Sequence, residues 1–299
     1  MEVQEGISVL IPVYNRAVTE LTMALLAQKY RWPGPMEIIL LDDGSTGAFR
    51  VANRPLGKLA GVRYTESPGN VGRAAIRNQL ATAAHHDWLL LLDNDSLLPD
   101  DDYLARYAAA RSQAAVLIGG TSYASTPPID AALRLRWCYG LAREVRPAAV
   151  RQAAPYSQLT INNALVRTEI LLRFPLDERL TGYGHEDTKF GEELAAAHIP
   201  VQHLDNPVLH DGLEPAAAFL LKSEQAVHNL VRVFRENELG QDSRLLQTAL
   251  RLRRLGLAPA VRAGLGAAAP ALRRRLLSAA PQLRWFDLLK LYWLLRELA

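Results

Sequence analysis

Hydrophobic residues in the first hundred positions fall into short runs that are separated by helical segments and polar turns. The runs are dominated by aliphatic side chains, which is typical of strands buried on both faces of a sheet. Strands are expected at 7–14, 36–41, 62–65 and 88–92. Residues 18–30 and 70–84 lie between them and predict helices. Strands that alternate with helices need crossover connections, so the pattern predicts an α/β fold with a mainly parallel, Rossmann-like sheet.

The pattern becomes less regular after this part and then turns helical. A strand is expected at 116–118, a helix over 188–198 and a strand-like run over 201–209. Beyond residue 214 the spacing is almost wholly helical. Breaks in that helical part are expected at Gly240, 256–259, 264–270 and Pro281. The sequence therefore predicts an α/β domain over 1–214 and a helical extension over 215–299.

Charge is distributed unevenly along the chain. The 299 residues are 49% hydrophobic and 22% charged, which is ordinary for a globular protein and excludes a disordered or fibrous chain. Residues 241–299 hold 11 Lys and Arg against 3 Asp and Glu, a net charge of +8. The other 240 residues hold 23 Lys and Arg against 28 Asp and Glu, a net charge of −5. The basic character of the chain therefore belongs to the extension. A single cysteine, Cys138, excludes an internal disulfide and a thiolate metal cluster.

Polar residues follow three of the expected strands at the point where each strand ends. They are Tyr14, Asn15 and Arg16 after the first strand, Asp42 and Asp43 after the second, and Asp93, Asn94 and Asp95 after the fourth. Ligands of open parallel sheets bind outside the carboxyl ends of the strands. We therefore expect these residues to lie together in a ligand-binding site.

Asp93 and Asp95 place two carboxylates on the same side of an extended segment. Hard divalent cations such as Mg²⁺ and Mn²⁺ take oxygen ligands, and they often bind one or two carboxylates together with substrate phosphates. The pair is therefore a candidate metal site that suits a nucleotide diphosphate. The alternative at this point is that Asp93-Asn94-Asp95 only forms a turn.

Five sequence blocks follow one another between residue 7 and about residue 212. They read SVLIPVYNR, EIILLDDGST, NVGRAAIRN, LLLLDNDSLL and GYGHEDTKFG. In this order and spacing they resemble the family 2 glycosyltransferases of the GT-A fold. The resemblance implies that residues 1–214 form a GT-A catalytic domain, of hexosyltransferase type, that moves a sugar with inversion from a nucleotide-diphosphate sugar to a hydroxyl acceptor. It also implies a UDP-sugar donor, a glycan or glycolipid acceptor, Mn²⁺ or Mg²⁺ as cofactor, and a role in cell-surface polysaccharide or glycolipid synthesis.

The resemblance assigns nucleotide-binding roles to residues near the strand ends. Pro12, Tyr14, Asn15 and Asp42 match the lining of the family's nucleoside pocket. Arg77 matches a position that contacts the nucleotide, and a guanidinium group suits a base edge or a phosphate. The alternative for Arg77 is a solvated arginine on a helix.

The same resemblance assigns the metal and the donor pocket. Asp95 matches the metal ligand that bridges to the diphosphate, and Asp93 matches the residue that faces the ribose or a metal-bound water. His210 matches a position at which many relatives have a histidine near the metal or diphosphate, although a lone histidine is more often structural. Asn163, with Asn162, resembles a stretch that lines the donor pocket.

Glu186 and Asp187 match the family's acidic pair near the acceptor. An inverting transfer needs a carboxylate that accepts the proton of the acceptor hydroxyl while its oxygen attacks the anomeric carbon. Asp187 is expected to be this base. Glu186 is the alternative base and otherwise hydrogen-bonds the acceptor or the donor sugar. A third interpretation is that both acids only cap the helix that follows.

The helical extension combines leucine-rich faces with arginines and aromatic side chains. A basic amphipathic helix of this kind can lie in a membrane interface with anionic lipids. Its anchors would be Trp285, Phe286, Tyr292 and Trp293. The alternative is that the leucines pack on the catalytic domain or on a second protomer of a homo-oligomer. We expect a cytoplasmic protein, peripheral on the inner face of the membrane if the extension binds lipid, with no nucleic-acid partner because no recognition module is visible.

Two other classes of function compete with the transferase. A nucleotidyltransferase shares the Rossmann-like sheet and the paired acids, but it would have a glycine-rich basic loop where this chain has Pro-Val-Tyr-Asn. A catalytically silent nucleotide-sugar-binding or scaffold protein would not need both acidic pairs. The sequence contains no G-x-S-x-G, H-E-x-x-H, Walker or G-x-G-x-x-G motif.

Overall fold

The computed structural model describes residues 5–180, 184–237 and 243–299. Two compact units are present. The first, the sheet unit, consists of Met1–Tyr123, Val145–Arg179 and Glu186–Gly212, and the second, the helical unit, consists of Ala124–Glu144, Leu180–His185 and Leu213–Ala299. The expected domain boundary at residue 214 stays a prediction.

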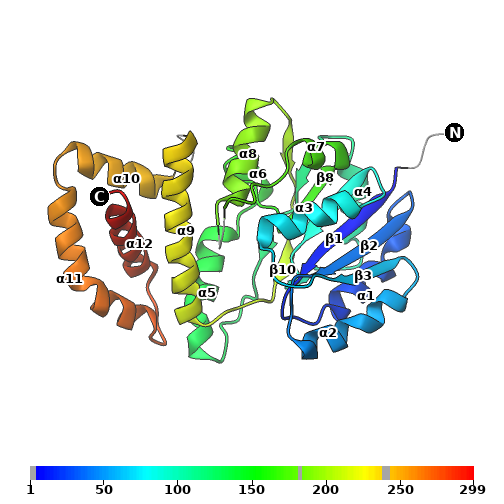
Figure 1. Ribbon diagram of the computed structural model, residues 1–299, viewed down its shortest axis with the longest axis horizontal. Helices are drawn as coiled ribbons and strands as arrows, with labels where there is room; N and C mark the ends of the chain where they lie inside the picture. The colour runs from blue at the N-terminus through cyan, green and yellow to red at the C-terminus, as the bar shows by residue number, and fades with distance from the viewer. Residues whose placement is uncertain (1–4, 181–183, 238–242) are drawn as a thin grey trace. The chain divides into compact units, whose positions relative to one another are not determined.

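A seven-stranded sheet is the framework of the sheet unit (Figure 1). From edge to edge its strands are β3 (Val62–Glu66), β2 (Met36–Asp42), β1 (Ile7–Val13), β4 (Trp88–Leu92), β8 (Asn163–Arg167), β6 (Val116–Ile118) and β9 (Val201–His203). The pairings β3–β2, β2–β1, β1–β4 and β6–β9 are parallel, whereas β8 is antiparallel to both neighbours. The mainly parallel sheet is therefore confirmed, and the first four expected strands are found within one residue.

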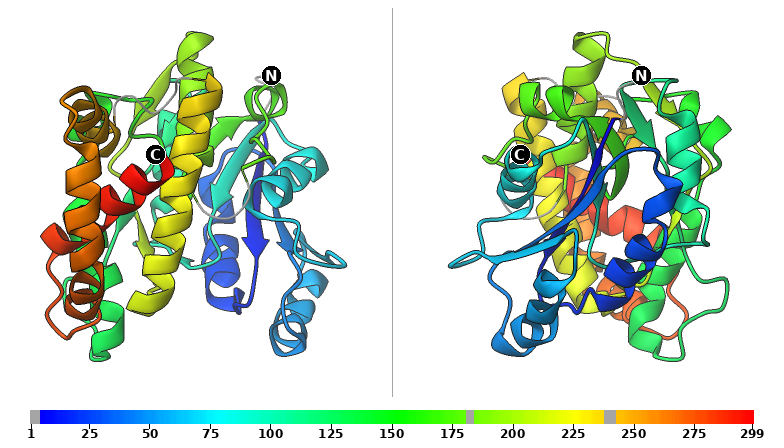
Figure 2. Two further views of the ribbon diagram at one scale, coloured as in Figure 1. Left: turned by 60° about the vertical axis from the view of Figure 1, so that its left-hand side comes forward. Right: turned by 90° about the vertical axis from the view of Figure 1, so that its right-hand side faces the viewer.

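Helices cover both faces of this sheet, as the two views of Figure 2 show. On one face lie α1 (Thr19–Ala27) and α4 (Tyr103–Ala110); on the other lie α3 (Arg73–Ala83), α7 (Thr168–Arg173) and α8 (Glu186–Ala196). Shorter helices are η1 (Lys29–Arg31), α2 (Gly47–Asn53), η2 (Arg54–Lys58) and α6 (Ala148–Gln152). In β1, Val9 and Ile11 join the first core and Leu10 joins the second, as the two-residue period of a strand requires. Both faces of the strand are therefore buried, which explains why its sequence is almost wholly apolar.

A second, three-stranded sheet lies beside the carboxyl end of β4. Its order is β5 (Ser96–Leu97), β10 (Val208–His210) and β7 (Thr121–Ser122). β10 is antiparallel to β5 and pairs His210 with Ser96. The backbone N–H of Asp211 donates to the carbonyl of Asp95 at 2.9 Å. This small sheet therefore brings His210 next to Asp95, although 115 positions separate them in the sequence.

The helical unit has a core of its own. Its elements are η3 (Ala131–Leu133), α5 (Arg134–Tyr139), η4 (Gly140–Glu144), α9 (Ala216–Asn237), α10 (Arg244–Arg254), α11 (Ala258–Leu276) and α12 (Leu283–Glu297). Leucine and aromatic side chains of these helices pack together, with Leu246, Leu276 and Leu289 fully buried. No helix within the described residues has both the length and the apolar character that crossing a bilayer requires.

Two expectations for the helical part are wrong. Phe286 and Trp293 are only 1% exposed and lie in the core of the helical unit, so they cannot anchor the protein in a membrane. Trp285 and Tyr292 are partly buried against the same core. The break expected at 264–270 is also absent, because α11 continues through Pro270. Pro270 is exposed, so its ring does not disturb the packing of the unit. Gly240 lies outside the described residues.

Candidate active site

The loop after β1 is fastened to the loop after β2. Asn15 has a left-handed backbone with φ of 48°, which Asn tolerates better than most residues. Its N–H donates to Ser45 Oγ at 2.8 Å, and its Oδ1 accepts from the N–H of Thr46 at 2.9 Å. Pro12 is half-buried, whereas Tyr14 is 51% exposed. The exposed ring of Tyr14 is therefore available to stack on a ligand at this edge.

Asp42, at the end of β2, is fully buried. Its Oδ1 accepts from the N–H of Ser45 at 2.7 Å and from Arg50 Nε at 3.3 Å, and its Oδ2 lies 3.4 Å from the hydroxyl of Tyr64. Burial, and next the charge of Asp42, raise the pKa of Tyr64, so this tyrosine stays protonated and donates. Asp42 thus holds the wall of the expected nucleoside pocket together through the backbone of Ser45 and the side chains of Arg50 and Tyr64.

Asp43 follows β2 at the expected ligand-binding edge, and the sequence predicts no specific role for it. Its Oδ1 accepts from the N–H of Val71 at 2.7 Å and its Oδ2 from the N–H of Gly72 at 3.3 Å. Burial raises the pKa of Asp43. Gly72, with φ of 96°, is the residue directly before α3, so Asp43 fixes the point at which α3 begins. The signal in the sequence that could have indicated this role is a carboxylate that follows a buried strand and precedes Gly-Ser.

Two arginines of α3 connect the acid after β4 with the acid that begins α8. Arg77 is buried and donates to Asp93 Oδ1. Arg73, one helical turn earlier, donates from Nε to Glu186 Oε1 at 2.8 Å, and its Nη2 lies 3.7 Å from Asp93 Oδ2. The alternative of a solvated Arg77 is therefore wrong, and its contact with the nucleotide stays a prediction. Both guanidinium groups hold Asp93 and Glu186 within one charged cluster.

Asp187 lies in this cluster without a partner for one of its oxygens. Its Oδ1 is closed off from solvent and has no hydrogen-bond partner among the described residues. Burial, and next the charge of Glu186, raise the pKa of Asp187 to about 7, although Arg77 and Arg73 oppose the shift. Burial also acts on Glu186, but Arg73 and Arg77 outweigh it and lower the pKa of that carboxyl. The pKa values of the two adjacent acids are thus shifted in opposite directions, which is the pattern expected when one of them exchanges a proton near neutral pH.

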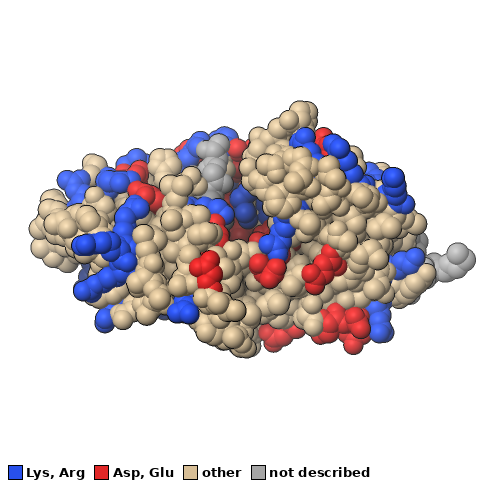
Figure 3. All heavy atoms as spheres, turned by 90° about the horizontal axis from the view of Figure 1, so that it is seen from below, with Lys and Arg blue, Asp and Glu red and all other residues tan. Residues whose placement is uncertain are grey.

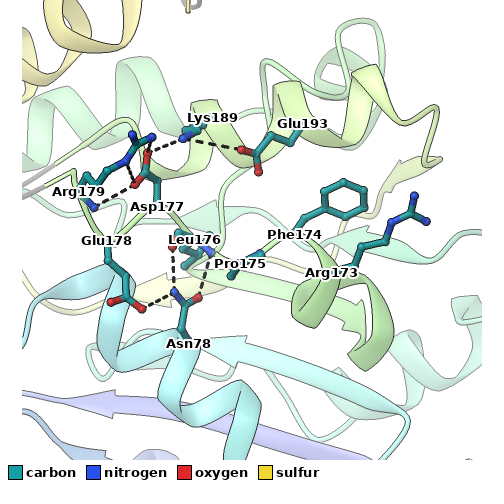
Figure 4. Close-up of a pocket in the computed structure, with 10 residues that line it drawn as sticks. All are labelled: Asn78, Arg173, Phe174, Pro175, Leu176, Asp177, Glu178, Arg179, Lys189 and Glu193. Carbon is teal, nitrogen blue, oxygen red and sulfur yellow. Dashed lines mark hydrogen bonds and ion pairs between the residues drawn. The ribbon is translucent and has the colours of Figure 1, made fainter. Parts of the chain in front are cut away.

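The chain before α8 is anchored by a third residue of α3. Asn78 donates from Nδ2 to the carbonyl of Leu176 and to Glu178 Oε1, both at 2.9 Å, and accepts from the N–H of Leu176 at 3.0 Å (Figure 4). Asp177 is paired with Lys189 of α8 and with Arg179, and the hydrogen bond from Arg179 lowers its pKa. These residues line an open pocket of about 470 Å³. The same helix therefore fixes Arg73, Arg77 and the segment that leads toward Glu186.

Asp95 and His210 form a candidate metal site. Nδ1 of His210 lies 3.4 Å from Asp95 Oδ1, in an orientation that gives no hydrogen bond. Asp95 Oδ1 and His210 Nε2 are both buried without a hydrogen-bond partner among the described residues. The described residues contain no set of three or more metal-ligating side chains. An oxygen and a nitrogen ligand that still lack partners fit a cation whose other positions are taken by donor phosphates and water.

Gly212 leaves room for the Asp95 carboxylate. A Cβ at position 212 would lie 2.0 Å from Asp95 Oδ2 and 2.6 Å from its Cγ. Gly212→Ala is therefore expected to displace Asp95 and to weaken Mn²⁺ binding by roughly tenfold. Isothermal titration with Mn²⁺ in the presence of UDP measures this. The matched control is Gly47→Ala, because a Cβ there meets nothing within 4 Å; equal Mn²⁺ affinity in both variants contradicts the prediction.

Asn163 does not line the donor pocket. It is 0% exposed, and its Oδ1 accepts from the hydroxyls of Tyr103 and Tyr107 at 2.6 and 2.7 Å. Its Nδ2 donates to the carbonyls of Gly120 and Asn206, each at 2.8 Å. Because every polar atom of this amide is used inside the fold, the residue ties β8 to its surroundings and the expected ligand contact is wrong.

A comparison with protein families matches residues 8–162 to glycosyl transferase family 2. An uncharacterized glycosyltransferase of Haemophilus influenzae is 34% identical over 98 residues, which are 32% of this chain and 38% of that protein. Validoxylamine A glucosyltransferase of Streptomyces hygroscopicus subsp. limoneus is 27% identical over 236 residues, which are 65% of this chain and 49% of that protein. The chain therefore spans less than half the length of each of these two curated relatives.

Solved structures share the fold at low sequence identity. The mannosyltransferase PcManGT of Pyrobaculum calidifontis, in complex with GDP-Man and Mn²⁺, matches with a TM-score of 0.62 at 18% identity over 98% of this chain and 86% of that one. Glucosyl-3-phosphoglycerate synthase of Mycobacterium tuberculosis, in complex with Mn²⁺, UDP and glucosyl-3-phosphoglycerate, matches with a TM-score of 0.53 at 16% identity over 76% and 79%. Both show the GT-A fold. Since the family match covers more than half of its residues, the chain belongs to glycosyl transferase family 2.

Proposed function

We propose that the protein is an inverting glycosyltransferase that moves a hexosyl group from a UDP-sugar to a hydroxyl group of a glycan or glycolipid, in the assembly of a cell-surface polysaccharide or glycolipid. The observation that carries the proposal is the Oδ1 of Asp187, which has no hydrogen-bond partner in the described parts of the chain and belongs to a carboxyl whose pKa is raised to about 7. A carboxylate in this state can take up a proton near neutral pH.

The proposed reaction needs one base. The acceptor oxygen forms a bond to the anomeric carbon while the bond from that carbon to the diphosphate oxygen breaks. The electron pair of the broken bond leaves with UDP, and the hydroxyl proton of the acceptor passes to Asp187. Attack from the face opposite the diphosphate inverts the configuration at the anomeric carbon.

The remaining residues have supporting roles in the proposal. Asp95 and His210 would hold Mn²⁺ or Mg²⁺, and a cation there supplies positive charge beside the departing diphosphate. Arg77 holds Asp93 in place, and Arg73 holds Glu186 as the hydrogen-bonding neighbour of the base. Tyr14 offers its exposed ring to the nucleobase. The proposed site lies entirely within the sheet unit.

Titration of the protein with UDP, and with GDP as comparator, tests the nucleotide part of the proposal. The neighbours named above are complexed with GDP-Man or with UDP, so fold alone does not choose between the bases. In Mn²⁺ we expect UDP to bind at least about tenfold more tightly than GDP, with the preference lost in EDTA. Absence of binding by either nucleotide would falsify the transferase assignment.

A second readout separates a transferase from a silent nucleotide-sugar-binding protein. A transferase releases UDP from its own UDP-sugar, slowly by hydrolysis without acceptor and faster with acceptor. The alternative hypothesis, a silent scaffold protein, predicts a different result. Such a protein binds UDP-sugars but releases UDP from none of them, with or without glycan acceptors.

A further inference from the structure

We propose that the turn between α10 and α11 of the helical unit docks on the surface of a bilayer that contains anionic lipids. This docking surface consists of Arg251, Arg253, Arg254, Leu255, Leu257 and Arg262. It differs from the aromatic anchors expected from the sequence, of which Phe286 and Trp293 are buried and Trp285 and Tyr292 are partly buried. The proposal does not depend on the proposed function, because the surface lies in the helical unit and shares no residue with the candidate active site.

Charge is the first argument. Between Ser243 and Phe286 the sequence contains nine arginines and no lysine, aspartate or glutamate. Arg251, Arg253 and Arg254 at the end of α10 are exposed, and none of them forms an ion pair with another described residue. Figure 3 shows that basic side chains also gather over the helical unit on the face seen from below. A strongly basic surface with unused charges fits an anionic partner.

Exposed leucines between these arginines are the second argument. Leu255 is 61% and Leu257 is 48% exposed, on either side of Gly256 with φ of 70°. The leucines within α10 itself pack against the core, with Leu246 fully buried. Apolar side chains that project from a basic turn can enter the acyl boundary while the arginines stay among the headgroups.

A shallow basic pocket at the turn is the third argument. It has a volume of about 400 Å³ and is lined by Arg253, Gly256, Ala258, Pro259, Arg262, Leu295, Leu298 and Ala299. No Asp or Glu side chain is among these lining residues. The first turn of α11 and the last turn of α12 both border it, and a helix N-terminus favours negative charge whereas a helix C-terminus disfavours it, so the attraction for an anion comes from the two guanidinium groups. The phosphate of a lipid can contact the guanidinium groups of Arg253 and Arg262, and apolar side chains line the rest of the pocket.

The opposite end of α11 provides a matched control. Arg274 and Arg275 lie near that end, about 25 Å along the helix from its first residue, and Arg284 lies in the first turn of α12. Together they carry the same charge as Arg251, Arg253 and Arg254. There, however, Arg275 and Arg284 lie over the ring of Trp285, at 4.9 and 4.6 Å from its centroid. One exposed leucine, Leu277, accompanies them. The two arginine triples therefore carry equal charge but differ in how free their side chains are, and they differ in the number of exposed leucines beside them.

Sedimentation of the full chain with vesicles tests the proposal. We expect binding to vesicles of phosphatidylcholine mixed with phosphatidylglycerol to exceed binding to phosphatidylcholine alone by at least about tenfold. The triple variant Arg251→Gln, Arg253→Gln and Arg254→Gln is expected to lose roughly a hundredfold in partitioning. Leu255→Ser with Leu257→Ser is expected to lose roughly tenfold. The control Arg274→Gln, Arg275→Gln and Arg284→Gln should lose less than about threefold.

Each of three results would overturn the proposal. They are equal binding to the two kinds of vesicle, equal losses in the two arginine triples, and displacement from the vesicles by inorganic phosphate at constant ionic strength. The last result would mean that the pocket takes a free anion rather than a membrane. Because all substituted side chains are exposed, unchanged circular dichroism and melting temperature are expected and show that the variants are folded.

Discussion

An Asp187→Asn variant is expected to lose turnover by roughly 10²–10⁴-fold, with its affinity for UDP unchanged within about twofold. The amide has nearly the same volume as the carboxyl but cannot accept the proton of the acceptor hydroxyl. The buried Oδ1 of Asp187 makes no hydrogen bond to any described residue, so an amide group at this atom breaks no hydrogen bond with the described parts of the chain. Initial rates of UDP release from a UDP-sugar, with and without acceptor, measure the loss.

Glu186→Gln is the matched control for this prediction. Glutamine still offers an oxygen to Arg73 Nε, which now lies 2.8 Å from Glu186 Oε1, so we expect a loss of only about tenfold. If Glu186→Gln abolishes turnover and Asp187→Asn does not, the roles of the two acids are exchanged and the assignment of the base is wrong.

The raised pKa of Asp187 gives the same variant a signature in pH. The base must be ionised, so wild-type turnover is expected to rise as the pH increases through about 7.

The contribution of Asp187 to the stability of the folded state falls over the same direction of pH. The folded state keeps the Asp187 proton up to about pH 7, whereas the unfolded state releases it near 3.8, so the stability that the proton confers is lost as the pH rises between these values. Asp187→Asn should therefore melt higher than wild type at pH 8 and alike at pH 4. A variant that melts lower at pH 8 would show that its inactivity comes from damage to the fold.

The sequence predicted the parts of the site that depend on local pattern. The apolar run 88–92 followed by Asp93-Asn94-Asp95 could be interpreted because a buried strand and its polar end are both local signals. The parallel pairing of β1 with β2 and β4 then places three such ends at one edge of the sheet. The resemblance to the family supplied what spacing alone did not, namely that Glu186 and Asp187 belong with these ends.

The errors concern side chains whose role depends on contacts between distant segments. Asp42 ends β2 and Asn163 begins β8, yet the amide of Asn163 is fully hydrogen-bonded to Tyr103, Tyr107 and two carbonyls that only the fold brings to it. The aromatic side chains of α12 have no pattern that separates a membrane anchor from a core residue. Phe286 and Trp293 are buried because α9 and α11 pack against their helix, and pairwise helix packing cannot be deduced from one helix.

Loss of the metal site is the other large effect that we expect. Asp95→Ala should make UDP affinity in Mn²⁺ equal to that in EDTA, and should lower the rate of sugar transfer by roughly 10²–10³-fold. Asp95 provides the only carboxylate oxygen of the candidate site, and its substitution leaves the imidazole of His210 as the one remaining ligand. A single neutral nitrogen is a poor ligand for Mg²⁺ and a weak one for Mn²⁺, which prefer oxygen.

Controls for this prediction come from the same small sheet. Asp211→Asn removes a carboxylate one residue from His210, but Asp211 is paired with Arg16 and half-exposed, so metal-dependent UDP binding should persist. His210→Ala should weaken Mn²⁺ binding by about tenfold, less than Asp95→Ala, because it removes a neutral ligand and leaves the charged one. Binding of Mn²⁺ can be followed directly by the loss of its free electron-spin resonance signal on addition of protein and UDP. If Asp95→Ala retains EDTA-sensitive UDP binding, the cation is held elsewhere, and Asp93, whose present partners are Arg77 and Arg73, becomes the ligand to replace next.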